Sequence, residues 1–164
     1  MKKRTRFLAH AAIIAALYAV ITHMQNFLLP GSATWAIQFR LSEALCVLAY
    51  FTPAAALGLS VGCLLFNLTF SAALPLDFLL GTLATYLAAK GMWLCRKKPF
   101  PALFFPALTN AVLVGLELTV YIGGGFWFNA VTVAIGEAVV LLTLGNLLYH
   151  AMKKRGLDAR LFSL

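Results

Sequence analysis

The sequence predicts an all-α integral membrane protein, a single bundle of six transmembrane helices with both termini in the cytoplasm. The first observation is composition: 62% of the residues are hydrophobic and 11% are charged, about half the charge of a soluble domain of this size. The second is that the apolar residues form long stretches. The third is that basic residues gather between these stretches, as they do on the cytoplasmic flanks of membrane spans.

Three basic clusters contain every Lys and Arg residue of the chain except Arg40. They consist of Lys2, Lys3, Arg4 and Arg6; of Lys90, Arg96, Lys97 and Lys98; and of Lys153, Lys154, Arg155 and Arg160. An even number of crossings must separate each pair of clusters if all three lie on the inner side. At span ends the net charge of +8 orients the chain and meets anionic membrane lipids, so nucleic acid is not an expected partner.

A membrane span needs about 20 apolar residues, which divides the chain into six stretches. The expected spans are 7–24, 40–51, 54–72, 75–95, 102–121 and 126–151. The first follows a basic cluster and ends without a small-residue cleavage pattern, so we expect it to be retained rather than removed as a signal peptide. A Pro-Gly-Ser sequence then indicates an outer loop over 25–39. The second span is short and ends before Pro53, where the third begins.

The fourth expected span begins at Pro75 and ends at the second basic cluster. The fifth ends at Gly123–Gly125, which predict a tight outer turn into the sixth. Four crossings then separate the first two clusters and two separate the last two, and both numbers are even. A single kinked span over 40–72 is the alternative, but it would place the second cluster outside. Residues 1–164 are expected to form one membrane domain.

Four of the five carboxylates fall inside the expected spans, where an unpaired charge costs several kcal/mol. Glu43 and Asp77 lie near the outer starts of their spans, Glu117 near an outer end, and Glu137 deeper in the sixth span. All four therefore belong to the outer half of the membrane. This predicts a substrate pocket that opens outward, with Glu137 as its floor.

Arg40 enters the second span from the outside, one helical turn before Glu43. The pair either holds the preceding loop onto the bundle or also lines the mouth of the pocket, and the two roles are compatible. Asn67 and Asn129 fall at the depth of the acids, although a buried Asn is more often an interhelical contact. Trp35 and Trp127 are the best candidates to stack on a flat ligand, and an interfacial aromatic belt is the alternative.

Small residues repeat every four positions in the first span, at Ala11, Ala15 and Ala19, flanked by Ala12 and Ala16. Such a stripe allows a second helix to approach closely, either from a partner or from the chain's own bundle. Three cysteines fall in apolar segments without metal-ligand spacing and are expected to be buried thiols. The chain also lacks the motifs of nucleotide hydrolysis or dinucleotide binding, so we expect no metal and no cofactor.

The segment Gln38-Phe39-Arg40-Leu41-Ser42-Glu43-Ala44-Leu45 resembles the signature of the QueT family, which is associated with queuosine precursors. Asp77 with Gly81-Thr82, and Gly136-Glu137, resemble later motifs of that family. The likeness covers nearly the whole chain. More broadly, short spans with an alanine stripe on the first resemble the S components of energy-coupling factor (ECF) transporters.

The resemblance implies a non-enzymatic S component in a bacterial cell membrane that binds a deazaguanine from outside. It implies as partners an ECF T component and two ATPase subunits, with Ala11, Ala15 and Ala19 as the docking surface. It also implies that the S component rotates in the membrane to release its substrate. The residues leave two alternatives open: an S component for another small heterocyclic or cationic solute, and a small intramembrane enzyme whose acids perform acid–base catalysis.

Overall fold

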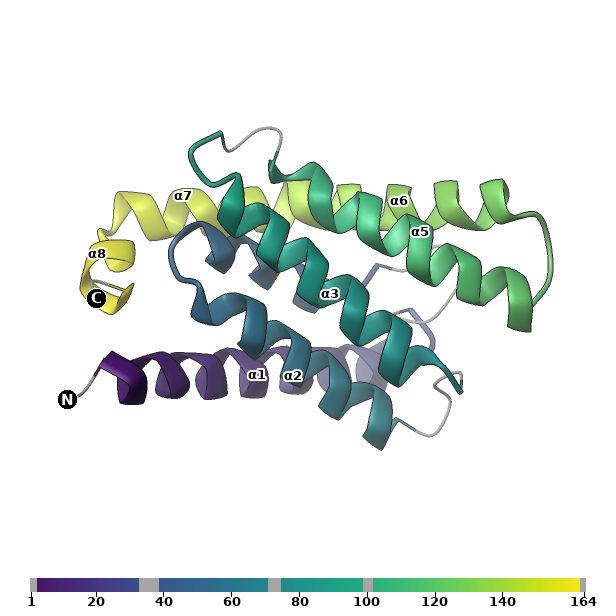
Figure 1. The fold of residues 1–164 in the computed structure, drawn as a ribbon, viewed down its shortest axis with the longest axis horizontal. Helices are drawn as coiled ribbons and strands as arrows, with labels where there is room; N and C mark the ends of the chain where they lie inside the picture. The colour runs from purple at the N-terminus through teal and green to yellow at the C-terminus, as the bar shows by residue number, and fades with distance from the viewer. Residues whose placement is uncertain (1–2, 33–38, 71–74, 99–101, 163–164) are drawn as a thin grey trace.

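The computed structural model describes residues 3–32, 39–70, 75–98 and 102–162, and all regular structure in these ranges is helical. Figure 1 shows the helices side by side in one bundle. In chain order they are α1 (Lys3–Leu28), the 3₁₀ helix η1 (Leu41–Tyr50), α2 (Ala54–Thr69), α3 (Asp77–Leu94), α5 (Phe104–Tyr121), α6 (Phe126–Val140), the π-helical turn η2 (Leu141–Gly145), α7 (Asn146–Lys154) and α8 (Leu157–Phe162). Helix α6 passes through η2 into α7, so the last expected span is one long helical rod.

Each expected span contains a helix, but the lengths of these helices differ. Among the described residues, three helices are long and apolar enough to cross a membrane: α1, α5 and the rod over Phe126–Lys154. Two shorter apolar helices, η1 and α2, lie between them in the chain. The all-helical membrane fold is therefore confirmed, whereas six spans and cytoplasmic termini remain predictions.

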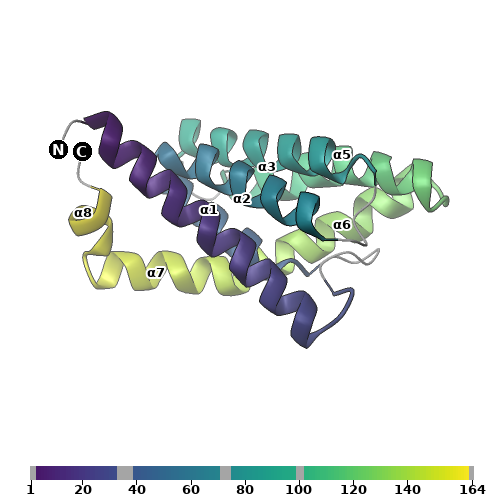
Figure 2. The same ribbon diagram turned by 90° about the horizontal axis from the view of Figure 1, so that it is seen from below.

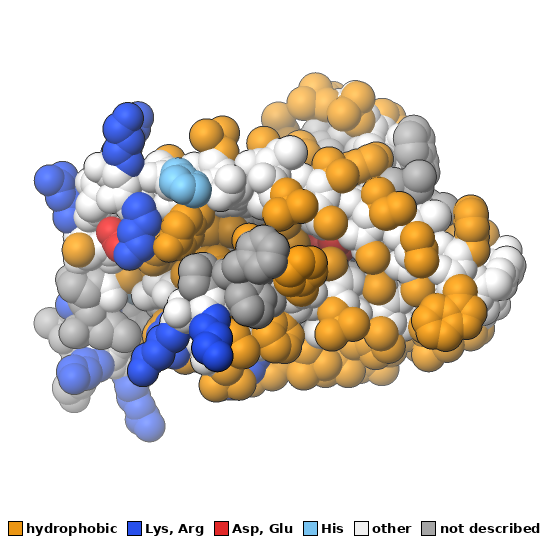
Figure 3. Space-filling view, turned by 90° about the horizontal axis from the view of Figure 1, so that it is seen from above, with side chains coloured by type: hydrophobic (Ala, Val, Ile, Leu, Met, Phe, Trp, Pro, Cys, Tyr) orange, Lys and Arg blue, Asp and Glu red, His pale blue; other side chains and the backbone are white. Residues whose placement is uncertain are grey.

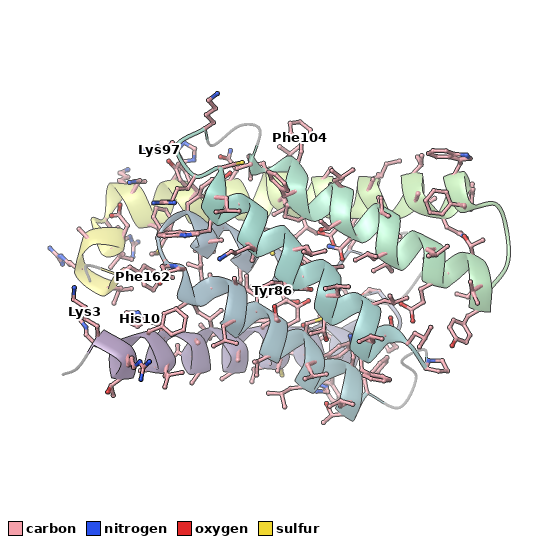
Figure 4. All side chains as sticks on the ribbon, viewed as in Figure 1. Lys3, His10, Tyr86, Lys97, Phe104 and Phe162 are labelled. Carbon is pink, nitrogen blue, oxygen red and sulfur yellow. The ribbon has the colours of Figure 1, made fainter. Side chains whose placement is uncertain are left out.

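The two chain termini lie at the same end of the bundle, and the α5–α6 turn lies at the other (Figures 1 and 2). Basic side chains gather at the end with the termini, whereas hydrophobic side chains cover most of the rest of the visible surface (Figure 3). Lys3 and Lys97, from two different clusters, both lie toward this end (Figure 4). The arrangement agrees with three clusters on one side of a membrane, and we call this part of the molecule the basic end.

Two glycines close the α5–α6 connection, as the sequence predicted. Gly123 and Gly124 have φ values of +88° and +83°, a conformation that residues with a Cβ rarely adopt.

At the basic end, the sequence did not predict the short helix α8. This helix folds back so that Phe162 packs edge-on against His10 of α1, with ring centroids 5.2 Å apart (Figure 4). Lys153 donates a 2.8 Å hydrogen bond to Asp158, which lowers the pKa of that carboxyl group.

Helices α1 and α2 pack closely because α2 presents glycines to the small residues of α1. A Cβ atom placed on Gly58 would lie 2.6 Å from the Ala11 carbonyl oxygen, and one on Gly62 would lie 2.7 Å from the Ala15 carbonyl oxygen. Both distances are shorter than atoms tolerate, so these positions require glycine. The close approach buries Tyr18 completely in the core between the helices.

This packing shows which way the alanine stripe faces. Ala11 and Ala15 are buried against α2, and Ala19 is half-buried. The structure therefore shows the intramolecular alternative at these two positions and leaves no free docking surface there. Ala12 and Ala16, which have the same four-residue spacing, are exposed on the surface of the bundle.

The α1–α2 contact predicts the effect of one added methyl group. Gly62→Ala should lower the free energy of unfolding by about 1–3 kcal/mol, because its Cβ would meet the backbone of α1. Chemical unfolding of purified protein in detergent measures the change. Gly125→Ala is the matched control, since Gly125 has φ of −81° and open space around it. Equal stability of the two variants would contradict the packing described here.

Candidate functional site

Four buried carboxyl groups and one buried guanidinium form the polar centre of the bundle. Glu43 lies on η1, Asp77 opens α3, Glu117 lies on α5 and Glu137 on α6, and each of these side chains is at most 8% exposed. Arg40, which precedes η1, is buried to a similar degree. The centre is therefore assembled from four helices that are distant in the sequence.

The positive charge of Arg40 interacts with several of these acids. Its guanidinium interacts electrostatically with Glu43, Glu117 and Glu137. It also lies 3.8 Å from the Cys63 sulfur and 5.6 Å from the centre of the Phe66 ring on α2. The sequence predicted that Arg40 and Glu43 act together, and the structure extends this grouping to acids of α5 and α6.

Glu43 is held firmly from two sides. The Tyr18 hydroxyl of α1 donates a 2.5 Å hydrogen bond to one carboxyl oxygen, and the Cys46 thiol donates a 3.1 Å hydrogen bond to the other. Both oxygens of Glu43 therefore already have protein partners. These two bonds fix the position of Glu43, and each of its oxygens keeps a second lone pair that can accept a hydrogen bond.

The segment before η1 is fixed by polar side chains of α1. The Gln25 amide donates to the Phe39 carbonyl oxygen, and the Leu41 backbone N–H donates to the Gln25 side-chain oxygen at 2.8 Å. The Thr22 hydroxyl donates to Ser42 at 2.7 Å. These contacts position Arg40 at the start of η1.

Glu137 is held on one side only. Asn110 of α5 donates a 3.0 Å hydrogen bond to Oε1 of Glu137, whereas Oε2 has no partner among the described residues. The Glu43 carboxyl group lies within electrostatic reach. Glu137 thus has a fixed orientation and one oxygen that can accept a hydrogen bond from a ligand.

Within the described part of the chain, Glu117 lacks a hydrogen-bond donor such as the Asn110 amide that holds Glu137. Neither of its oxygens accepts a hydrogen bond from an N–H or O–H group of the described residues, although the side chain is only 1% exposed. Its strongest charged neighbour is Asp77, which comes within hydrogen-bonding reach. Two neighbouring buried carboxyl groups repel each other when both are charged, and the guanidinium of Arg40 offsets part of this repulsion at Glu117.

Asn67 joins this part of the centre from α2. Its amide nitrogen donates to the Asp77 carbonyl oxygen at 2.7 Å and lies 3.5 Å from the Cys63 sulfur. Its side-chain oxygen is buried without a partner among the described residues. Asn67 therefore fixes the start of α3 and also offers an acceptor.

Two further expected site residues, Asn129 and Trp127, do not contact the acids of this centre in the contacts described. Asn129 closes the α5–α6 turn, donating to Thr119 and to the Gly123 carbonyl oxygen at 3.0 and 3.1 Å, which matches the expected alternative of an interhelical contact. Trp127 is 78% exposed, as an interfacial aromatic residue would be. Trp35 lies outside the described residues.

Three residues of the centre were missed by sequence reasoning: Tyr18, Cys46 and Asn110. Asn110 was the easiest to find, because a polar amide in an apolar span is a signal in itself. Tyr18 and Cys46 look like ordinary core residues in a sequence. All three cysteines are free; Cys46 and Cys63 are buried as expected, whereas Cys95 is only half-buried. Within the described ranges, no group of three His, Cys, Asp or Glu side chains could hold a metal ion.

An apolar helical bundle with a buried polar centre is the architecture of a membrane protein, and the unpartnered oxygens of this centre are hydrogen-bond acceptors. The particular family follows from sequence comparison. A family model described as QueT transporter matches residues 8–154, and the chain belongs to the QueT transporter family. It is therefore a membrane transporter, as the resemblance implied. No curated protein and no solved structure matches the chain.

The support of Glu43 predicts the consequence of losing one hydroxyl group. Tyr18→Phe should reduce the free energy of unfolding by about 1–3 kcal/mol, because one oxygen of a buried carboxyl group loses its donor. Thermal or chemical unfolding in detergent measures this change. Tyr121→Phe, at a residue that is 42% exposed, should leave stability within about 0.5 kcal/mol. The account of Glu43 is wrong if both variants are as stable as the parent.

Proposed function

We propose that the protein is the substrate-binding S component of an ECF-type importer in the bacterial cytoplasmic membrane. It captures a queuosine precursor, a deazaguanine, from outside and delivers it through a T component driven by two ATPase subunits. The observation that carries this proposal is the set of buried, unpartnered acceptors at Asn67, Glu117 and Glu137. A family of transporters also fits the expectation that the chain is not an enzyme.

The chemistry of a deazaguanine suits this centre. One edge of the ring presents a ring N–H and an exocyclic amine, which a single carboxylate can accept as a pair of hydrogen bonds. Glu137 supports this role, because Asn110 fixes its orientation and leaves Oε2 available. A solute that carries its own carboxylates would face repulsion from the buried acids instead.

The expected docking of a T component concerns the first helix. Since Ala11 and Ala15 contact α2, we move the proposed docking surface to the exposed neighbours Ala12 and Ala16. These two residues keep the four-residue spacing that allows a second helix to approach closely. Their small side chains would become the contact between α1 and the partner.

The proposed binding site predicts a loss of affinity for one substitution. Glu137→Gln should weaken the binding of a deazaguanine by roughly 10- to 100-fold, because a neutral amide replaces a charged acceptor. Calorimetric titration of purified protein against deazaguanines, guanine and common vitamins measures this and identifies the solute.

Asp158→Asn serves as the control, because Asp158 pairs with Lys153 at the basic end. It should bind like the parent. If Glu137→Gln also binds like the parent while remaining folded, Glu137 does not contact the ligand. If the parent binds another solute and no deazaguanine, the S-component role survives but the substrate assignment falls.

The docking surface predicts a defect in assembly without a defect in binding. Ala16→Trp should spare ligand binding and prevent co-purification with the T component, because a large side chain would hold the partner helix away. Leu116→Trp, at an exposed position on α5, is the control and should assemble normally. Normal assembly of Ala16→Trp would place the partner elsewhere.

A further inference from the structure

An apolar groove lies toward the basic end of the bundle, between α1 and the last two helices. Its walls include Ile13 and Leu17 of α1, Leu45 of η1, Leu148 of α7 and Leu161 of α8. The groove holds about 380 Å³, a volume in the range of small-molecule sites. Ile13, Leu17 and Leu161 are between 45% and 59% exposed, so the groove opens along the surface of the bundle.

The lining of this groove suits a hydrocarbon chain. His10 and Phe162 belong to its wall and pack edge-on against each other, so α8 is joined to α1 there (Figure 4). Apart from His10, every described residue of the wall is apolar. A polar solute would lose its hydration in the groove without gaining hydrogen bonds in return. Because the chain is a membrane protein, a lipid is the apolar molecule that the groove meets.

Two arginines next to this groove carry positive charges that no acidic side chain neutralises. Arg6 precedes His10 by one turn of α1 and so lies on the same helix face, and Arg160 directly precedes the two α8 residues of the groove wall. Neither arginine forms an ion pair with a described residue. The chain has only five acidic residues: four lie in the buried centre, and Asp158 is bonded to Lys153.

The groove and the proposed docking surface lie on different sides of α1. With about 3.6 residues per turn, His10, Ile13 and Leu17 share one side of this helix, whereas Ala12 and Ala16 lie on another. A lipid in the groove would therefore not compete with a partner helix bound at Ala12 and Ala16.

We propose that this groove binds an anionic phospholipid, with one acyl chain along Ile13 and Leu17 and the phosphate within reach of Arg6 and Arg160. Guanidinium groups bind phosphate oxygens through paired N–H groups, and basic pockets between helices at a membrane surface bind anionic headgroups. From Arg6 to Leu17, α1 rises about 16 Å, which is close to half the thickness of the hydrocarbon core. A headgroup at the arginines therefore leaves its acyl chain at the depth of the groove.

A comparison of two lipids with the same acyl chains tests the charge at this site. Native mass spectrometry of delipidated protein in detergent measures the binding of phosphatidylglycerol and of phosphatidylcholine. The parent should bind one phosphatidylglycerol about 30-fold more tightly than phosphatidylcholine, because each of the two arginines contributes roughly fivefold. The double variant Arg6→Gln/Arg160→Gln should lose most of this preference. Lys97→Gln removes a charge from another cluster of the basic end and should keep it (Figure 4).

A second set of variants tests the acyl-chain part of the site. Leu17→Trp should remove the one-to-one binding of both lipids, because the larger side chain would fill the groove. Ile13→Trp should act in the same way and serves if Leu17→Trp does not fold. Leu116→Trp, on the exposed side of α5, is the matched control and should bind like the parent. Thermal unfolding of each purified variant separates loss of structure from loss of binding.

Several results would overturn the lipid site. Equal binding of the two lipids by the parent overturns it, and so does a preference that survives in the double arginine variant. Unchanged binding by the tryptophan variants at positions 13 and 17 would place the lipid outside the groove. If these variants instead fail to assemble with the T component while their lipid binding is unchanged, the groove is a protein interface. None of these results bears on the binding of a deazaguanine, so the proposed function is tested separately.

Discussion

The burial of charge inside an apolar bundle is the constraint on which the other features of this protein depend. Four acids and Arg40 lie where water cannot solvate them, and each such group is expensive unless it is paired or hydrogen-bonded. The protein meets part of this requirement with its own donors: Tyr18 and Cys46 for Glu43, and Asn110 for Glu137. It leaves Glu117 unsupported. A stable fold has no need for such a group, which is why we connect it with a ligand.

The helix packing serves the same centre. Gly58 and Gly62 bring α2 so close to α1 that Tyr18 is enclosed, and its hydroxyl group can then reach Glu43 on η1. Helix η1 is short, and its start is tied to α1 by Gln25 and Thr22. Arg40 is therefore fixed at the point where acids from η1, α5 and α6 can share its charge. Backbone packing and charge placement depend on each other here.

Much of this arrangement could be predicted from sequence, because membranes restrict what a chain can do. Long apolar stretches bounded by basic clusters predicted the helices, and acids at such positions as Glu117 and Glu137 were predicted to matter because burial makes them costly. The family was also identified correctly from the residues around Arg40. The turn after α5 could be predicted from Gly123–Gly125, because glycine readily adopts the positive φ values that such a turn requires.

The remaining features depend on contacts between distant segments, which a sequence pattern does not reveal. A four-residue repeat of alanine fits Ala11 and Ala15 as well as Ala12 and Ala16, and only the glycines of α2 decide which pair is buried. In the sequence Tyr18 looks like an ordinary core residue, and only the structure shows that its hydroxyl group donates to Glu43. The sequence places Asn129 at the same expected membrane depth as the acids. In the structure, however, its amide donates to the Gly123 carbonyl oxygen and closes the α5–α6 turn.

The central claim is that the unpartnered acids of this centre receive the transported solute. An experimentally determined structure with a bound deazaguanine tests it most directly. Our account predicts the ring edge within hydrogen-bonding distance of Glu137 and a donor group of the ligand at Glu117. A ligand seated elsewhere, with Glu117 and Glu137 still lacking partners, would contradict it.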